Sequence, residues 1–286
     1  MWQRYTASLL VVFSLGAAAS PEKDVDKRCT DLLTSALEDK NPDTRKEAVM
    51  ALSLAPSRGP LITRLESMLD DKDVKVRLAT VASLSDLKSP REVPALKKAL
   101  QDPVPEVAFA AAKALYEAHV PAGRATLLSV LGGETKTSSG FIKSEIRDGM
   151  RLMHTPRAML MVGLKQGIGF IPVPGVGEGV TSLQGILNDS GVSGRATAAL
   201  LLGHEKDRQT IEALREALAD KDWSVRAAAV HSLALQNKPA LRKDFVPLLD
   251  DSKLPVRLRA AAAYLRLDDL AGRGGNRLEP VSATSH

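Results

Sequence analysis

The amino-acid sequence predicts an all-α fold, an α-solenoid of stacked helix-turn-helix repeats with a central irregular insert. In five places an Asp is followed six positions later by an Arg. A Leu stands two positions before each of these Asp residues, and a second apolar residue follows seven positions after each Arg. The frame recurs every 31 or 32 residues except at one step. Such a period is typical of solenoid repeats, in which each two-helix unit buries its apolar face against its neighbours.

The frame places an Asp and an Arg around the turn of each repeat, and one further repeat keeps the Asp but has Ala108 at the Arg position. The Asp and Arg residues are Asp39 and Arg45, Asp71 and Arg77, Asp102, Asp189 and Arg195, Asp220 and Arg226, and Asp251 and Arg257. The second apolar anchors are Leu52, Leu84, Leu115, Leu202, Leu233 and Tyr264. We interpret the Asp and Arg residues as structural. Arg226 is expected to pair with an Asp of its own turn or of an adjacent turn.

The spacing of apolar residues predicts two helices in each repeat. Ile211, Leu214 and Leu218 fall at i, i+3 and i+7, which is one face of a helix that ends at the frame Asp. The second helix of this repeat is expected to begin near Ser224. In the second helices of the repeats, the positions three and six residues beyond the Arg position are occupied mostly by Ala, which lets neighbouring helices approach closely.

These frames resemble the HEAT repeat family, particularly the short bacterial HEAT-like repeats of the phycobilisome-lyase type. The resemblance covers roughly residues 31 to 121 and 178 to 268. It implies a ladder of ion pairs in which the Asp and Arg of successive repeats hold the stack together. Ala108 interrupts that ladder in the third repeat.

Residues 1–19 are interpreted as a secretory signal peptide. One Arg precedes an apolar run that ends in three Ala residues, a pattern typical of a cleavage site near Ala19. The alternative is a first buried helix.

Cleavage would remove Arg4 and no acidic residue, which lowers the formal net charge from +5 to +4. This surplus is modest, and no nucleic-acid partner is expected. The protein is expected to be periplasmic or extracellular, where its single cysteine, Cys29, has no partner for an internal disulfide.

The chain is divided into repeats 31–132, an apolar and basic insert 133–177, repeats 178–268 and a disordered tail 271–286. The step between the third and fourth frame Asp is 87 residues, which leaves 56 residues more than one period. We expect the insert at the seam between the two halves. Its run from Ala158 to Gly177 is apolar, but Pro172 and Pro174 leave too short a helix to span a membrane.

The insert holds the candidate binding residues. It has six Lys and Arg against three Asp and Glu, and four of the seven Met residues. A basic helix beside a Met-rich apolar surface suits a membrane surface or a hydrophobic groove of a partner. The candidate residues for binding a protein or lipid are Lys143, Arg147, Arg151, Met159, Met161, Phe170 and Ile171. The alternative is that the segment only covers the seam between the two halves.

Catalytic and metal-ligating patterns are weak, and we assign no catalytic residue, metal or cofactor. The dipeptide His204-Glu205 is the single His-Glu pair, whereas the HEAT-like di-iron hydroxylases use several. No His-x3-His spacing accompanies it.

We expect an exported, non-enzymatic scaffold that binds an unknown protein through the solenoid surface and the central insert. The alternatives are a peripheral protein on an anionic membrane surface and a HEAT-like enzyme of the lyase or metal-dependent hydroxylase type.

Overall fold

The computed structural model describes residues 21–55, 59–132 and 194–275, and the regular elements in these ranges are all helices. The expected signal peptide, the insert 133–177, frame residue Asp189 and most of the tail lie outside the described residues. The prediction of an all-α solenoid is confirmed.

The N-terminal half contains seven α-helices and two short 3-10 helices among its described residues. These are α1 (Pro21–Leu37), α2 (Pro42–Leu52), α3 (Gly59–Ser67), η1 (Met68–Asp70), α4 (Val74–Asp86), η2 (Pro90–Glu92), α5 (Val93–Ala99), α6 (Pro105–Glu117) and α7 (Pro121–Leu131). Asn41 and Asp73 cap α2 and α4, each accepting a hydrogen bond from a backbone N–H of the first turn.

The C-terminal half begins in the structure with the second helix of a repeat. Its elements are α11 (Gly194–Leu201), η3 (Leu202–His204), α12 (Arg208–Ala217), α13 (Trp223–Leu235), η4 (Pro239–Asp250) and α14 (Leu254–Gly275). Asp207 and Asp222 cap α12 and α13. The first helix of the last repeat is a 3-10 helix, η4, that contains Pro247, which lacks a backbone N–H to donate.

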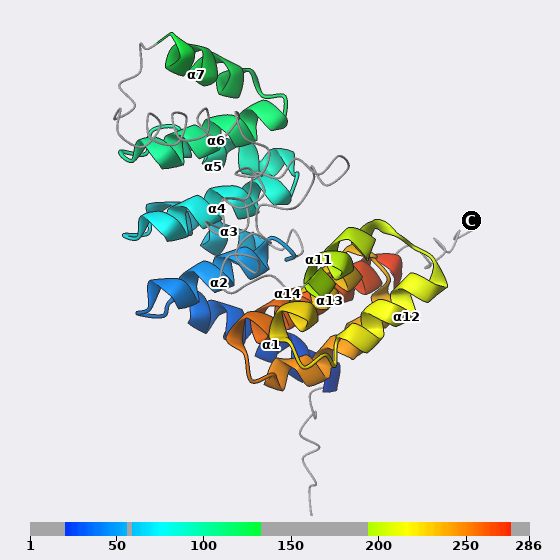
Figure 1. Ribbon diagram of the computed structural model, residues 1–286. Helices are drawn as coiled ribbons and strands as arrows, with labels where there is room; N and C mark the ends of the chain where they lie inside the picture. The colour runs from blue at the N-terminus through cyan, green and yellow to red at the C-terminus, as the bar shows by residue number, and fades with distance from the viewer. Residues whose placement is uncertain (1–20, 56–58, 133–193, 276–286) are drawn as a thin grey trace, which may run out of the picture.

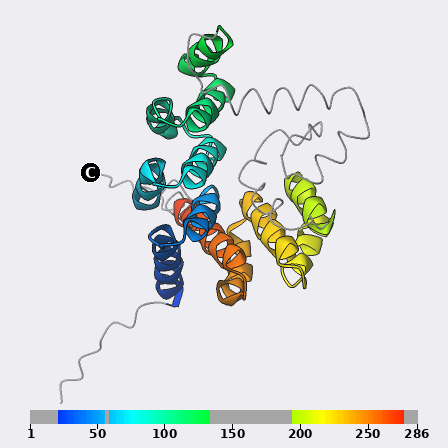
Figure 2. The same ribbon diagram turned by 60° about the vertical axis from the view of Figure 1, so that its left-hand side comes forward.

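The second helices of the repeats form one continuous row. Within each half α2 packs on α4, α4 on α6, α11 on α13, and α13 on α14. Ala-rich surfaces permit this close stacking: the residues from Ala227 to Ala234 on α13 are all buried, as are those from Leu258 to Leu265 on α14. The row follows an arc, and in the N-terminal half α7 lies beyond α6, the last second helix described there (Figures 1 and 2).

The two halves meet through the last and the first helices of the described chain. Helix α14 packs against both α1 and α2, so the last repeat stacks directly on the first (Figure 1). Helices α7 and α11, which flank the insert in sequence, belong to the two opposite ends of the stack. The expected seam between the third and fourth repeats is therefore not the contact that joins the halves. Residues more than 200 positions apart make that contact instead.

The junction continues the stacking pattern found within each half. In the N-terminal half, Asp70, the residue before a frame Asp, pairs with Lys98 of the next repeat at 2.7 Å, and at the junction Asp250 pairs in the same way with Arg28 of α1. Cys29 and Leu33 of α1 are fully buried in the core cluster that also holds Leu265 of α14. Apolar burial, rather than the exposed ion pairs, therefore provides most of the stability of this contact.

Two boundaries differ from those expected. Helix α1 begins at Pro21, so the first repeat starts ten residues before residue 31. Helix α14 continues to Gly275 and includes the first residues assigned to the tail.

The second helices α4 and α6 end two residues before Lys88 and His119, which have φ angles of 49° and 57° and so turn the chain out of the helix. The same frame position in α14 is Asp268, where the helix continues and extends the contact with α1.

Candidate functional surface

The frame Asp and Arg residues form ion pairs between neighbouring repeats. Arg226 Nε donates to Asp251 Oδ2 at 2.6 Å and Nη2 donates to Oδ1 at 2.8 Å. The pairs Arg45–Asp71 and Arg77–Asp102 have the same two-point geometry, at 2.7 and 2.8 Å and at 2.8 and 3.1 Å. Arg195 pairs with Asp220. Two parallel hydrogen bonds between a guanidinium and a carboxylate combine charge with fixed orientation.

The six-residue spacing arises from the turn of a single repeat. Arg226 Nη1 donates to the backbone carbonyl oxygen of Asp220, six residues earlier, at 2.8 Å. The carboxylate of Asp220 accepts the backbone N–H of Asp222 at 2.8 Å, which shapes the same turn. Arg226 therefore contacts both turns: the carbonyl of its own Asp and the carboxylate of the adjacent Asp.

Burial shows that most of these residues are structural. The side chains of Arg45 and Asp71 are each 7% exposed. Burial alone would raise the pKa of the Asp71 carboxyl, but the hydrogen bonds from Arg45 and from a backbone N–H outweigh it and lower the pKa. Asp251 shows the same balance with Arg226. Such buried, saturated pairs hold the repeats in register and offer no free group to a substrate.

The ladder of ion pairs between frame Asp and Arg residues changes at two points. Ala108 ends it in the third repeat, as expected. At the junction, Arg257 donates to the Asp251 carbonyl at 2.7 Å, and in the described part of the chain it forms no ion pair with Asp39. The ion pair that joins α14 to α2 is formed instead by Arg259 Nη1 and Glu47 Oε2, at 3.1 Å.

The predicted binding residues of the insert lie outside the described residues. This holds for Lys143, Arg147, Arg151, Met159, Met161, Phe170 and Ile171. Their role as contacts for a protein or a lipid therefore stays a prediction.

The structure reveals an apolar surface on α6 and α7 that the sequence analysis did not assign. We call it the α6–α7 end surface, and it consists of Phe109, Tyr116, Leu128 and Leu131, which are 38%, 53%, 49% and 84% exposed. Gly123 brings α7 against the backbone of α6, because a Cβ at this position would lie only 2.3 Å from the Tyr116 nitrogen. The signal in the sequence was the loss of the repeat frame after Leu131.

The opposite end exposes apolar side chains as well. Leu201 and Leu202 are 44% and 41% exposed. Leu202, one of the apolar anchors of the repeat frame, is therefore exposed, whereas the equivalent Leu233 is fully buried. Helix α11 ends at Leu201, and Leu202 is the first residue of the 3-10 helix η3.

The candidate chemical groups do not gather in one place. His204 and Glu205 are both exposed at the end of η3. Cys29 is fully buried, and burial raises the pKa of its thiol to about 12, which disfavours the reactive thiolate. Within the ranges that the structure describes, no group of three His, Cys, Asp or Glu side chains is placed to hold a metal ion.

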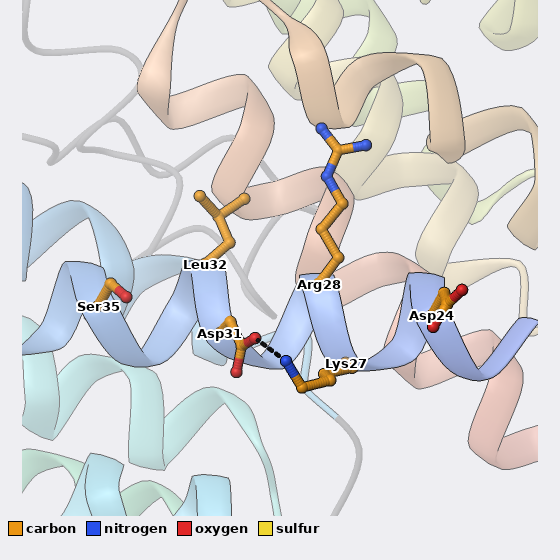
Figure 3. A pocket seen from close by; sticks show the side chains of 6 residues that line it. All are labelled: Asp24, Lys27, Arg28, Asp31, Leu32 and Ser35. Carbon is orange, nitrogen blue, oxygen red and sulfur yellow. Dashed lines mark hydrogen bonds and ion pairs between the residues drawn. The ribbon is translucent and has the colours of Figure 1, made fainter. Parts of the chain in front are cut away.

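A shallow hollow lies on the outer face of α1. It is lined by Asp24, Lys27, Arg28, Asp31, Leu32 and Ser35, all on this one helix (Figure 3). Lys27 and Asp31 pair with each other at 3.1 Å, and Arg28 is engaged by Asp250 of η4. Because the lining comes from one face of one helix, and Lys27, Asp31 and Arg28 are already paired, this hollow is not an enclosed binding site.

Comparisons with known proteins identify the repeat. A family model described as HEAT repeats matches residues 61–137 and 181–266. This match does not extend to the phycobilisome-lyase type. No curated protein matches the sequence. Among the helices of the described residues, none is long and apolar enough to cross a membrane.

Two solved structures resemble the chain at low identity. One is human deoxyhypusine hydroxylase in complex with glycerol, with 18% identity, a TM-score of 0.33, and coverage of 87% of this chain and 97% of that one. The other is an engineered protein, with 16% identity, a TM-score of 0.23, and coverage of 86% and 97%. At these TM-scores neither likeness bears on the function of this chain.

Proposed function

Because this chain belongs to the HEAT repeat family, we propose that it is an exported, non-enzymatic scaffold that binds another protein through its solenoid surface and its insert. A solenoid suits this role because its surface grows with the number of repeats and needs no enclosed pocket. The expected signal peptide supports export, and the basic and apolar composition of residues 133–177 supports a role of the insert in binding.

The observation that carries the proposal is the α6–α7 end surface. Four large apolar side chains are exposed there on two adjoining helices. The whole chain contains only three Tyr and five Phe, and this surface exposes one of each. Exposed apolar patches mark interaction sites, and aromatic side chains commonly supply a large share of the binding energy of protein interfaces.

The test compares two variants of the mature protein. Tyr116→Ser with Leu131→Ser alters the α6–α7 end surface, whereas Leu201→Ser with Leu202→Ser is the matched control at the opposite end. A partner isolated with the wild type is purified, and its affinity is measured by titration. We expect the first variant to weaken binding at least about tenfold and the control to bind like the wild type. Equal affinity of all three proteins would show that this surface is not the binding surface.

A peripheral membrane role is the alternative, motivated by the basic residues of the insert. It predicts that the mature protein sediments with anionic vesicles at low salt, and less so at high salt or with neutral vesicles. The triple change of Lys143, Arg147 and Arg151 to Ala is expected to abolish such sedimentation. Absence of sedimentation under every condition eliminates the lipid role.

The enzyme alternative predicts bound metal or chromophore. Elemental analysis and an absorption spectrum of purified protein test it directly. Stoichiometric iron or a bound chromophore would overturn the non-enzymatic proposal.

A further inference from the structure

The second helices form a row with two different ends. They pack in the order α11, α13, α14, α2, α4 and α6, and α7 lies beyond α6 (Figures 1 and 2). The row has one direction, because the frame Arg of a repeat pairs with the frame Asp of the next repeat in both halves. Arg226 does so with Asp251, and Arg45 with Asp71. Each inner contact therefore joins the following face of one repeat to the preceding face of the next.

One of these contacts forms without a local connection along the chain. Helix α14 packs on α1 and α2 although the residues that meet are more than 200 positions apart. Arg257 donates to the backbone of its own turn and, in the described part of the chain, forms no ion pair with Asp39. Repeats of this protein therefore stack without being neighbours in sequence and without the frame ion pair. At the far end of the row Ala108 likewise supplies no Arg to a following repeat.

Both ends of the row expose apolar side chains. All the large apolar side chains that are exposed within the described ranges lie there: Phe109, Tyr116, Leu128 and Leu131 on the α6–α7 end surface, and Leu201 and Leu202 at α11 and η3. A solenoid that stays monomeric carries terminal repeats with a polar outer face, because an uncapped end presents the kind of face that neighbouring repeats bury. The described ends of this row therefore resemble inner faces of the stack.

The exposed residues lie on the outward sides of their helices. Ala196 and Ala199 are the buried residues of α11, and the Ala199 carbonyl oxygen accepts a hydrogen bond from Ser232 of α13 at 2.8 Å. Leu201 follows Ala199 by two residues, which is about 200° around a helix, so it lies on the side away from α13. Among the described helices, α7 is a first helix without a second one, and α11 is a second helix without a first one.

We propose that the α6–α7 end surface binds the α11 end of a second copy of this chain, so that copies assemble head to tail. Helix α7 of one copy and α11 of the next then supply the two helices of one repeat, and the row of second helices continues from copy to copy. A contact between two different surfaces generates open chains or rings rather than a two-fold dimer.

Self-assembly goes beyond the proposed scaffold function, in which the same α6–α7 end surface binds another protein. Titration of that partner at protein concentrations below those of self-assembly measures the two contacts separately.

The test is sedimentation velocity of the full mature chain over a range of concentrations. The variants are Leu131→Asp and Leu201→Asp, whose Leu side chains are 84% and 44% exposed, so neither change is expected to unfold the protein. The matched control is Thr63→Asp, which places the same charge on an exposed position of α3 inside the row. Circular dichroism compares the helix content of all the proteins.

The wild type and Thr63→Asp are expected to form larger species as the concentration rises. Each Leu variant alone is expected to self-associate at least about tenfold more weakly, because the contact would bury a charge against apolar side chains. An equimolar mixture of the two Leu variants is expected to form a dimer, because Leu201→Asp keeps an intact α6–α7 end surface and Leu131→Asp keeps an intact α11 end.

Three results would overturn the proposal. The first is a wild type that stays monomeric at every concentration. The second is self-association of either Leu variant alone at wild-type strength, which for Leu201→Asp would indicate pairing between two α6–α7 end surfaces. The third is a mixture of the two Leu variants that remains monomeric.

Discussion

Replacing Arg226 by Ala is expected to be strongly destabilising. The side chains of Arg226 and Asp251 are 13% and 6% exposed, and the change leaves the Asp251 carboxylate buried without its cation. It also removes the donor to the Asp220 carbonyl. Breaking a buried ion pair from one side costs about 3 kcal/mol or more. For a chain of this size the loss corresponds to a melting temperature lower by roughly 6–12 °C.

The matched control is Arg195→Ala, the same frame position in another repeat. Arg195 is 54% exposed, so its pair with Asp220 is expected to contribute at most about 1 kcal/mol. Urea unfolding followed by circular dichroism gives both free-energy changes. Hydrogen exchange shows whether the loss spreads from α13 to α14, since solenoid repeats are stabilised by their neighbours.

A double variant isolates the charge effect. Changing Asp251 to Ala together with Arg226 removes the uncompensated carboxylate, so the double variant is expected to lose less stability than the sum of the two single changes. The reasoning is refuted if Arg226→Ala and Arg195→Ala lose the same small free energy of unfolding, since burial would then not determine the strength of the ladder.

Three further outcomes are expected. Burial, together with Arg259, Arg266 and His204, lowers the pKa of His231 to about 3, below its usual 6.5. The folded state therefore loses about 1.4 kcal/mol per pH unit as pH falls below 6.5, and urea titrations of His231→Phe should lack this component. Burial and the nearby Glu66 raise the pKa of Glu92, which is 2% exposed with an unpartnered Oε2. Folding therefore favours the protonated form of Glu92 relative to the unfolded chain, so stability falls as pH rises through and above the ordinary Glu range. Glu92→Gln should abolish that fall and gain about 1 kcal/mol at pH 7, measured by urea unfolding. Finally, the mature chain produced as two pieces, divided within 133–193, should co-elute in size-exclusion chromatography because α14 packs on α1 and α2. Leu265→Asp should separate the pieces, and separation without that change would contradict the junction.

The repeat architecture was predictable because its causes are local. The Asp and Arg of one frame are six residues apart and share a turn, as the bond from Arg226 to the Asp220 carbonyl shows. The helical faces also repeat within about 31 residues, so the helices of each repeat could be placed from their apolar spacing. Leu202 departs from this regularity, since it begins the 3-10 helix η3 and is 41% exposed.

Parts of the candidate surfaces were not predictable from the sequence. The exposure of Tyr116 depends on which helices pack against α6 in the fold, and the apolar pattern of α6 by itself resembles that of a buried helix. Arg259 is an ordinary residue of an amphipathic helix in the sequence, and only the packed fold leaves it 2% exposed and paired with Glu47 of α2. Burial is a property of neighbours in the fold, and a single-helix pattern does not contain it.

The sequence by itself determined the repeat unit, its two helices and the residues of the ion-pair ladder, since each depends on contacts within a turn or on a fixed helical period. Only the tertiary structure decided the order of the repeats in space. The last repeat stacks on the first through Arg259 and Glu47, which are 212 residues apart, because every repeat presents a similar apolar face and the frame alone does not specify which face meets which.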